Sequence, residues 1–231
     1  MHKNMWEIRQ EAESADTLEL YIYDTVESDG WWYDSDTSAK HFRDELAKHP
    51  NAKEITVYIN SLGGSVMEGI AIYNQLKRHP AHKTVKIDGF ACSIASVIAM
   101  AGDTVIMPKN TVMMIHNAWT IAIGNSKELH KAADDLETIN QASRQAYLDK
   151  AGDKLSVEKL TELLDAETYL TAEQCLEYGL CDSFGDDDST EPGADPKQRA
   201  EAAARQQLEK EQNRRKEKAL AVLNSYFNKK H

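Results

Sequence analysis

Residues 83–102 constrain the fold more than any other stretch of the chain. They begin with alternating β-branched and polar residues, pass through Gly89, and end in small and apolar residues up to Gly102. This order predicts a strand that turns sharply into a buried helix. Ser93 falls at the turn, where the first backbone amides of the helix are free to face an anion. A nucleophilic serine needs such donors, because the charge of an acyl-transfer intermediate must fall on fixed groups.

The same stretch also fits a buried helix that packs through alanine and serine, since one serine at a strand–helix junction is weak support for chemistry. A second unit has the same layout, with a strand over 54–60, the turn Gly63-Gly64 and a helix over 66–78. Paired glycines let the backbone bend tightly and approach a ligand. They can equally be a plain turn, and the Gly-Lys-Ser/Thr of a phosphate loop is absent.

Strands that alternate with helices favour a parallel α/β sheet. Further strands are expected over 18–23, 103–107 and 111–117, and a helix over 38–48. In such a sheet, ligands bind beyond the carboxyl ends of the strands. The Gly63-Gly64 turn and the Ser93 turn should therefore meet at one edge of the sheet.

Apolar residues at helical spacing indicate which faces of the helices are buried. In helix 66–78 the candidate core residues are Met67, Ile70, Ala71, Tyr73 and Leu76. A long helix opens after Gly124-Asn125, with Ser126 as its expected N-cap. Its apolar stripe runs from Leu129 to Tyr147, and a shorter helix follows over 156–164.

His116 ends the apolar run that starts at residue 111. A lone histidine at such a place is often a core residue with satisfied hydrogen bonds. In a sheet that already presents a serine, it is equally suited to be the base that takes the serine's proton. The residues alone leave both interpretations open.

Two carboxylates precede the last helix of the main body. Thr171 and Gln174 form a capping box, which begins a helix that ends at Gly179. Asp165 and Glu167 lie just before this helix. They are candidate functional carboxylates, and the alternative is two solvated loop acids.

The charge of the 231-residue chain is unevenly placed. Residues 197–231 contain ten Lys and Arg and four Glu, so this part carries about +6 and the rest of the chain about −17, for a net charge of −11. An acidic body makes nucleic acid an improbable main ligand. By composition, residues 185–197 are an acidic linker and residues 198–231 a basic, mostly helical tail.

The remaining composition bears on the compartment. No run is long and apolar enough to span a membrane, and the N-terminus lacks the apolar core of a signal peptide. The three cysteines show no CxxC spacing, which argues against a disulfide framework. The sequence therefore predicts a cytoplasmic protein that binds no membrane, no metal and no cofactor.

Four segments, taken in order, resemble the proteolytic subunit of Clp protease. They are YINSLGG at 58–64, GFACS at 89–93, MMIH at 113–116 and LTAEQCLEYGLCD at 170–182. Each motif alone is weak, whereas the ordered set is specific. Three further segments are similar to the ClpP-related head maturation proteases of phages and prophages: AMAGD at 99–103, MIHN at 114–117 with Trp119 after it, and Gly124-Asn125.

The resemblance implies an α/β ClpP/crotonase-like fold of repeated ββα units with a charged helical extension at the C-terminus. Residues 1–16 would be an N-terminal segment and residues 17–184 the peptidase domain. By position, Ser93 matches the nucleophile and His116 the general base. The backbone amides of Gly64 and Ile94 match the donors of the oxyanion hole.

Two positions depart from the family pattern. The third catalytic residue of the family is an aspartate, and Glu167 occupies its position here, with Asp165 as the fallback. The extra methylene of glutamate displaces the carboxylate by about one bond length, although glutamate can still orient a histidine. Leu62 replaces the proline that usually precedes the glycines.

The resemblance also implies partners. It predicts a homo-oligomer of stacked rings with helix 126–149 between the rings, a chamber that admits unfolded protein, and a Clp-type ATPase. The head-maturation subgroup implies capsid or scaffold protein as substrate and a targeting role for the basic tail. The alternatives are a catalytically idle ring or scaffold subunit that binds partners, and an acyl-CoA enzyme of the crotonase type, which the Ser93 and His116 pair disfavours.

Overall fold

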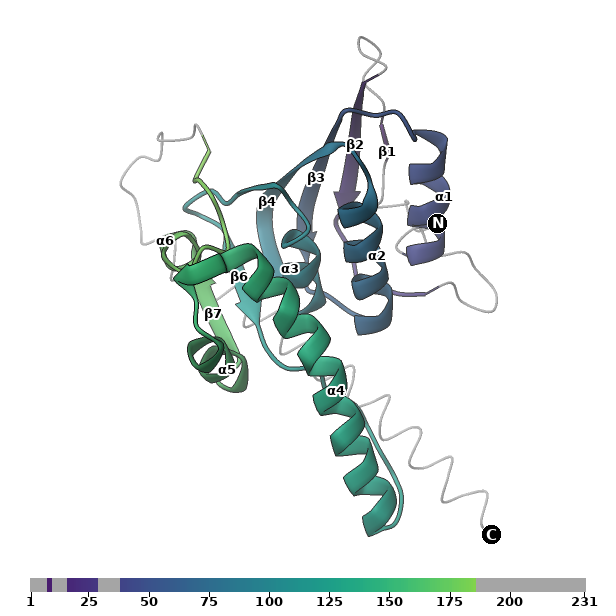
Figure 1. The fold of residues 1–231 in the computed structure, drawn as a ribbon, viewed down its shortest axis with the longest axis vertical. Helices are drawn as coiled ribbons and strands as arrows, with labels where there is room; N and C mark the ends of the chain where they lie inside the picture. Colours follow the sequence, from purple (N-terminus) through teal and green to yellow (C-terminus); the bar gives the residue numbers. More distant parts are fainter. Residues whose placement is uncertain (1–7, 10–15, 29–37, 186–231) are drawn as a thin grey trace.

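One mixed sheet forms the centre of the molecule (Figure 1). The computed structural model describes residues 8–9, 16–28 and 38–185. The sheet order is β1-β2-β3-β4-β6-β7, with β5 paired to β4. Strands β2 to β6 run parallel, while β1 and β7 are antiparallel to their neighbours at the two edges. The strands are β1 Ile8–Arg9, β2 Thr17–Ile22, β3 Glu54–Ser61, β4 His82–Cys92, β5 Thr104–Ile106, β6 Val112–Ile115 and β7 Thr168–Thr171.

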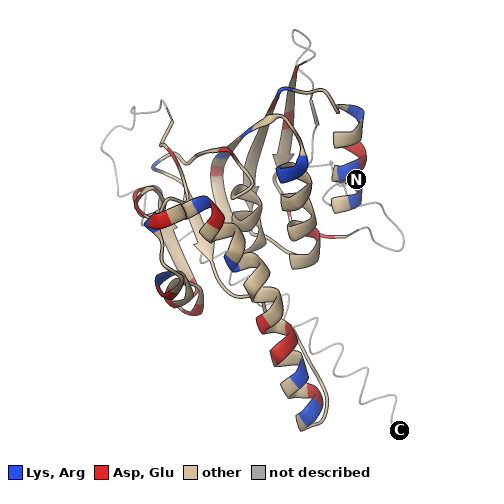
Figure 2. Ribbon diagram, viewed as in Figure 1, with Lys and Arg blue, Asp and Glu red and all other residues tan. Residues whose placement is uncertain are grey.

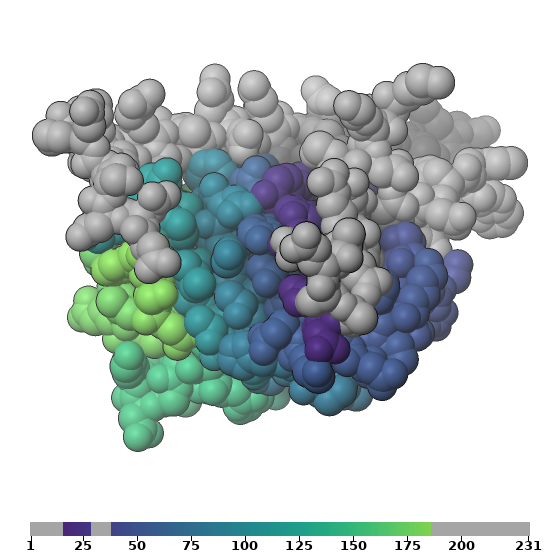
Figure 3. Space-filling model, turned by 90° about the horizontal axis from the view of Figure 1, so that it is seen from above, coloured from purple at the N-terminus to yellow at the C-terminus, as the bar shows by residue number. Residues whose placement is uncertain are grey.

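Helices α1 Ala39–Lys48, α2 Val66–Arg78 and α3 Ile94–Ala99 cover one face of this sheet (Figure 1). The long helix α4 Ser126–Ala151 extends beyond the body, and α5 Val157–Asp165 and α6 Ala172–Glu177 lie beside β7. Seen from above, α1 and the end of the described chain lie on opposite sides of the molecule (Figure 3). The predicted α/β fold class is confirmed.

Alternation along the strands explains how the core forms. In β2 and β3 every second side chain is buried, including Leu18, Leu20, Ile55 and Val57. Successive side chains of a strand point to opposite faces, so these residues share the face that the helices cover. Burying apolar surface of this kind contributes roughly 25 cal/mol per Å². The sheet therefore fixes the positions of its strand ends, from which the loops of the site emerge.

Three neighbouring parallel strands end at the same edge. Ser61 of β3 lies opposite Ala91 of β4, and Cys92 of β4 lies opposite Met114 of β6. The chain segments that follow β3, β4 and β6 therefore leave the sheet side by side. This is the edge at which ligands bind in parallel α/β sheets.

The structure departs from the sequence expectations at three places. Residues 168–171, for which no strand was predicted, form β7, which pairs with β6. The N-cap of α4 is Asn125 rather than Ser126, because Asn125 and Glu128 satisfy each other's backbone donors in a capping box. Met67 is 80% exposed rather than buried, since Gly69, Ile72 and Leu76 form the inward face of α2.

The apolar stripe of α4 is buried over part of its length. Ala146 and Tyr147 contact the core, whereas Leu129 and Ile139 are 43% and 38% exposed, because the helix extends past the sheet. Charged residues of both signs follow this protruding part (Figure 2), and Lys131 pairs with Asp135 at 2.7 Å. An apolar stripe among mixed charges suits contact with another protein surface.

Several predictions concern segments outside the described residues. The described helices include none that is long and apolar enough to cross a membrane. The proposed N-terminal segment 1–16 lies outside the described residues except for residues 8–9 and 16, and the linker 185–197 except for residue 185. The basic tail 198–231 lies entirely outside them.

Candidate active site

Ser93 lies at the sharp turn between β4 and α3. Its backbone has φ +54° and ψ −128°, in the left-handed half of conformational space that residues other than glycine rarely adopt. Although it is the N-cap residue of α3, its side chain makes no capping hydrogen bond. Its backbone amide donates to Met114 of β6 at 2.8 Å. The turn is therefore held by the neighbouring strand, and the hydroxyl remains available for another contact.

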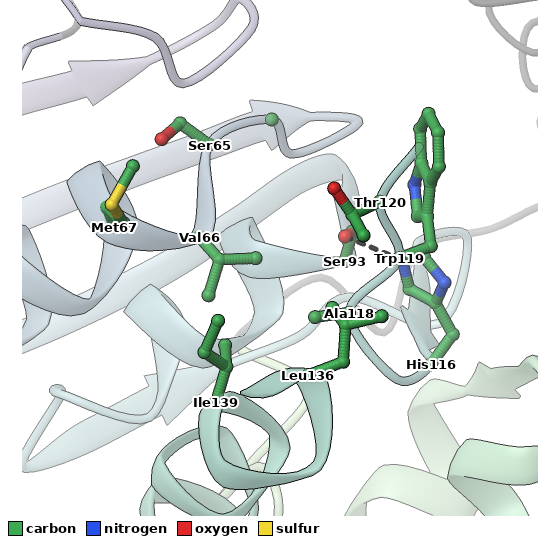
Figure 4. A pocket seen from close by; sticks show the side chains of 11 residues that line it. Ser65, Val66, Met67, Ser93, His116, Ala118, Trp119, Thr120, Leu136 and Ile139 are labelled. Carbon is green, nitrogen blue, oxygen red and sulfur yellow. Dashed lines mark hydrogen bonds between the residues drawn. The ribbon is translucent and has the colours of Figure 1, made fainter. Parts of the chain in front are cut away.

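His116 makes that contact. It follows β6 directly and is half-buried. Its Nε2 lies 2.7 Å from Oγ of Ser93, within hydrogen-bond distance (Figure 4). With the imidazole neutral and its proton on Nδ1, the Ser93 hydroxyl donates to Nε2. The two residues lie at the same edge of the sheet, in the arrangement that a serine and its general base require.

The Gly63-Gly64 turn packs against the Ser93 turn. A methyl group added to Gly63 would lie 2.7 Å from Cβ of Ser93 and 3.1 Å from the backbone nitrogen of Ile94, so only glycine allows this approach. Gly64 pairs with Val26 through the two residues that flank it in sequence. The carbonyl of Gly63 accepts from the amide of Val26, and the amide of Ser65 donates to the carbonyl of Val26. The amide of Gly64 therefore points to the opposite side of this segment, as the parallel pairing pattern requires.

The family resemblance makes the amide of Gly64 an expected oxyanion donor. Replacing Gly64 by alanine is therefore expected to lower kcat/KM roughly 100- to 1,000-fold, the usual cost of one lost donor of this kind. The added methyl group would overlap the carbonyl oxygen of Val26, and φ at this position is +152°. The turn would have to shift and take its amide with it. Hydrolysis of a fluorogenic peptide measures the effect.

Gly152→Ala is the matched control for this prediction. Gly152 also has a positive φ of +57°, but an added methyl group would meet nothing within 4 Å. The control also places a methyl group at a positive φ, at a residue that does not line the groove beside Ser93, and it should keep its activity. Full activity in the Gly64 variant would show that the position of this amide is unimportant.

The two candidate carboxylates have different surroundings. Asp165 ends α5, and its Oδ1 accepts a hydrogen bond of 2.7 Å from the side-chain amide of Asn117. Glu167 lies between α5 and β7 with φ +49°. Among the described residues, Ser93 and Glu167 are the two non-glycine positions with positive φ. Strained backbone of this kind clusters at functional sites, which favours Glu167 over Asp165 as a site residue.

An apolar groove of about 270 Å³ opens beside Ser93 and His116. Val66 and Met67 of α2 line one side, Leu136 and Ile139 of α4 another, and the segment after His116 closes the end (Figure 4). Gly64, Ser65, Ala118, Trp119 and Thr120 also line it. The exposed side chain of Met67 is thereby explained, because it faces the groove rather than the core.

Comparison with known proteins agrees with this geometry. The family model described as Clp protease matches residues 36–188. The chain belongs to the Clp protease family. It is also 35% identical over 142 residues to an ATP-dependent Clp protease proteolytic subunit of Ligilactobacillus salivarius (strain UCC118), covering 60% of this chain and 71% of that protein.

As a member of the Clp protease family, the protein is a serine endopeptidase with a ClpP-type fold.

The structure disfavours the neighbouring cysteine, Cys92, as an alternative nucleophile to Ser93. Burial raises the pKa of the Cys92 thiol to about 12, so the thiol stays protonated at neutral pH. Cys92 is also fully buried, which agrees with a packing role and not with a reactive one. Within the described ranges, no three His, Cys, Asp or Glu side chains gather closely enough to hold a metal ion.

Some residues of this Clp protease site were missed by the sequence analysis. Asn117 was quoted for the resemblance, but its contact with Asp165 was not foreseen. Asn140 accepts the backbone amide of Ala118 at 2.8 Å, across 22 residues of sequence. A polar residue within the apolar stripe of a helix was the available signal, because a buried polar side chain requires a partner.

Proposed function

We propose that Ser93 is the nucleophile of this endopeptidase and that His116 is its general base. The observation that carries the proposal is the 2.7 Å separation between Oγ of Ser93 and Nε2 of His116. The strained turn at Ser93 and the groove beside it support the same assignment. A serine hydroxyl is a weak nucleophile until a neighbouring base accepts its proton.

The reaction then follows the acyl-enzyme route. Nε2 of His116 takes the proton as Oγ of Ser93 attacks the scissile carbonyl, and the carbonyl oxygen becomes an oxyanion. The amides of Gly64 and Ile94 are the proposed donors to that oxyanion, because both belong to turns that pack together beside Ser93. His116 next protonates the leaving amine. Water, activated by the same imidazole, hydrolyses the ester and restores Ser93.

Glu167 is the proposed residue that orients His116. Replacing it by glutamine is expected to lower kcat by about 10⁴-fold, as the loss of the orienting carboxylate does in serine proteases. The matched variant is Asp165→Asn, which keeps an oxygen able to accept the hydrogen bond from Asn117. It should keep most of its activity, because Asp165 is engaged by Asn117. Initial rates on one peptide substrate compare the two variants.

The opposite ranking of these variants would assign the orienting role to Asp165. Equal and small losses would mean that neither carboxylate orients the histidine. Thermal unfolding should accompany the rate measurements, since Asp165 also links α5 to Asn117. A rate loss without a change in unfolding temperature marks a catalytic effect.

Protein is the substrate class that the family supports, and the groove suits an apolar side chain next to the scissile bond. The protruding part of α4 and its exposed Leu129 and Ile139 suit contact with a second subunit. We therefore infer a cytoplasmic homo-oligomer of stacked rings with α4 between the rings. We further infer that a Clp-type ATPase feeds it unfolded chain, because the relative is named an ATP-dependent subunit.

A fluorophosphonate probe tests the proposed nucleophile directly. The assembled protein should be labelled once per chain, and mass spectrometry should find the adduct on the peptide that contains Ser93. An assembled protein that remains unlabelled would instead be the catalytically idle ring or scaffold subunit. Sedimentation of the same sample establishes that the oligomer is present.

Head maturation is the finer proposal. The segments at 99–103 and 114–117 resemble the phage and prophage subgroup, which implies capsid or scaffold protein as the substrate. Residues 198–231 would then direct the protease into the assembling particle. Deleting residues 186–231 should reduce incorporation into particles, while cleavage of an unfolded peptide continues. Unchanged incorporation would remove the targeting role of the tail.

A further inference from the structure

One face of α4 carries three polar residues that contact the segments bearing Ser93 and His116. Asn140, Arg144 and Tyr147 are spaced by four and three residues, so they share one side of the helix. Asn140 and Tyr147 are 7% and 1% exposed. Their polar groups must therefore be satisfied within the protein.

Tyr147 reaches the serine through Ser96. Oγ of Ser96 lies 2.5 Å from the carbonyl oxygen of Ser93 and 2.6 Å from the hydroxyl of Tyr147. A carbonyl only accepts, so the single hydroxyl proton of Ser96 goes to Ser93 and Tyr147 must donate to Ser96. Burial raises the pKa of the Tyr147 phenol well above its ordinary value, which keeps that proton in place. A directed chain of two hydrogen bonds thus runs from α4 to the strained turn.

The same face reaches the histidine side. The chain leaves β6 at Ile115, directly before His116. Two residues after His116, the backbone amide of Ala118 donates to Oδ1 of Asn140 at 2.8 Å. Arg144 and, to a smaller extent, the side-chain amide of Asn140 lower the pKa of the Glu137 carboxylate. Nη1 of Arg144 forms an ion pair with Oε1 of Glu137 at 2.6 Å. Nη2 of Arg144 donates to Oδ1 of Asn117 at 3.4 Å. The backbone that carries His116 is therefore tied to α4 close to the imidazole.

We propose that this face of α4 positions both members of the Ser93 and His116 pair, with Tyr147 acting through Ser96 and Asn140 acting through the backbone at Ala118. The proposal rests on the proposed function and adds positioning residues to it. The hydrogen bond between Oγ and Nε2 spans 2.7 Å, and misplacement of a reacting group by about 1 Å can cost 100-fold in rate. Two anchors on one rigid helix fix the relative position of groups that come from different strands.

Two variants test the two anchors separately. Tyr147→Phe removes one hydroxyl and keeps the buried ring, and Asn140→Leu keeps the size of the side chain but removes the acceptor for Ala118. Each should lower kcat and the rate of fluorophosphonate labelling about 10- to 100-fold. KM should stay within about twofold, because the groove is lined by other residues. All rates are measured well below the unfolding temperature of each variant.

The matched control is Gln145→Ala on the exposed side of the same helix. Gln145 donates to Asp149 at 2.6 Å, so this variant also loses one hydrogen bond of α4, but at the surface. It should change neither kcat nor the labelling rate. The double variant Glu137→Gln with Asn140→Asp exchanges the carboxylate and the amide between the two positions. It restores an acceptor for Ala118 at unchanged charge and should recover most of the activity lost in Asn140→Leu.

The outcome separates positioning from stability. Lower unfolding temperatures with unchanged kcat and labelling in Tyr147→Phe and Asn140→Leu would overturn the proposal. So would failure of the exchange variant to recover activity. If the wild-type protein neither cleaves nor labels, the proposed function has failed, and ¹⁵N NMR of the His116 ring still decides the positioning. The Nε2 signal must shift in both variants and stay fixed in Gln145→Ala, and an unshifted signal would overturn the proposal.

Discussion

Ser93→Ala is expected to lower the rate of peptide hydrolysis by roughly 10⁶-fold, the loss seen when the nucleophile of a serine protease is removed. The hydroxyl is the atom that His116 contacts, and it takes no part in capping α3. The backbone amide of Ser93 would still donate to Met114. The variant should therefore keep its fold and unfolding temperature while it loses turnover and fluorophosphonate labelling.

Ser156→Ala is the matched control. Ser156 caps α5, and its side chain accepts the amide of Lys159 at 3.2 Å. Loss of an N-cap costs about 1 kcal/mol of stability. The control should therefore unfold at a lower temperature and keep its activity, which is the reverse of the result for Ser93→Ala. Hydrolysis that survives in Ser93→Ala would show that another residue is the nucleophile.

Local sequence signals explain most of the fold. The strand-turn-helix units around Gly63-Gly64 and Ser93 and the capping box of Thr171 with Gln174 appear where they were expected. These signals work because capping and turn formation involve residues that are close in sequence. The adjacency of β3, β4 and β6 then places the turns at one edge, as the rule for parallel sheets predicts.

Long-range contacts were beyond such signals. The hydrogen bond between Ser96 and Tyr147 joins residues 51 positions apart, and no local pattern specifies it. Met67 was misplaced for a related reason, because an apolar residue at helical spacing fits a core and a binding groove equally well. β7 was missed because its four residues lie between two helices and gain their pairing only from β6.

The choice between Glu167 and Asp165 shows how backbone geometry adds to sequence. Position in the family motif favoured Glu167, while its longer side chain left Asp165 as a fallback. The positive φ of Glu167 and the hydrogen bond from Asn117 to Asp165 are tertiary features that distinguish the two residues. They favour the same residue as the motif does, and the Glu167→Gln comparison tests that assignment.

His116→Ala is expected to lower hydrolysis by about the same factor as Ser93→Ala, roughly 10⁶-fold, and the double variant should be no worse than either single one. The hydroxyl and the imidazole act as one unit across their 2.7 Å contact, so removing either member removes the whole effect. Single-turnover assays of the three variants on one peptide measure this non-additivity. Losses that multiply in the double variant would mean that His116 acts on a separate step.

His82→Ala is the control histidine, because it lies at the opposite end of β4 from Ser93. The strand His82–Cys92 is extended, so the two residues are separated by about 30 Å. His82 contacts Asp103 and Thr104, away from the groove. Its removal should leave hydrolysis intact. A general base contributes at least about 100-fold to the rate. If the His116 variant kept more than about a hundredth of the activity, the loss would be too small for a general base. The imidazole would then have only a structural role beside the serine.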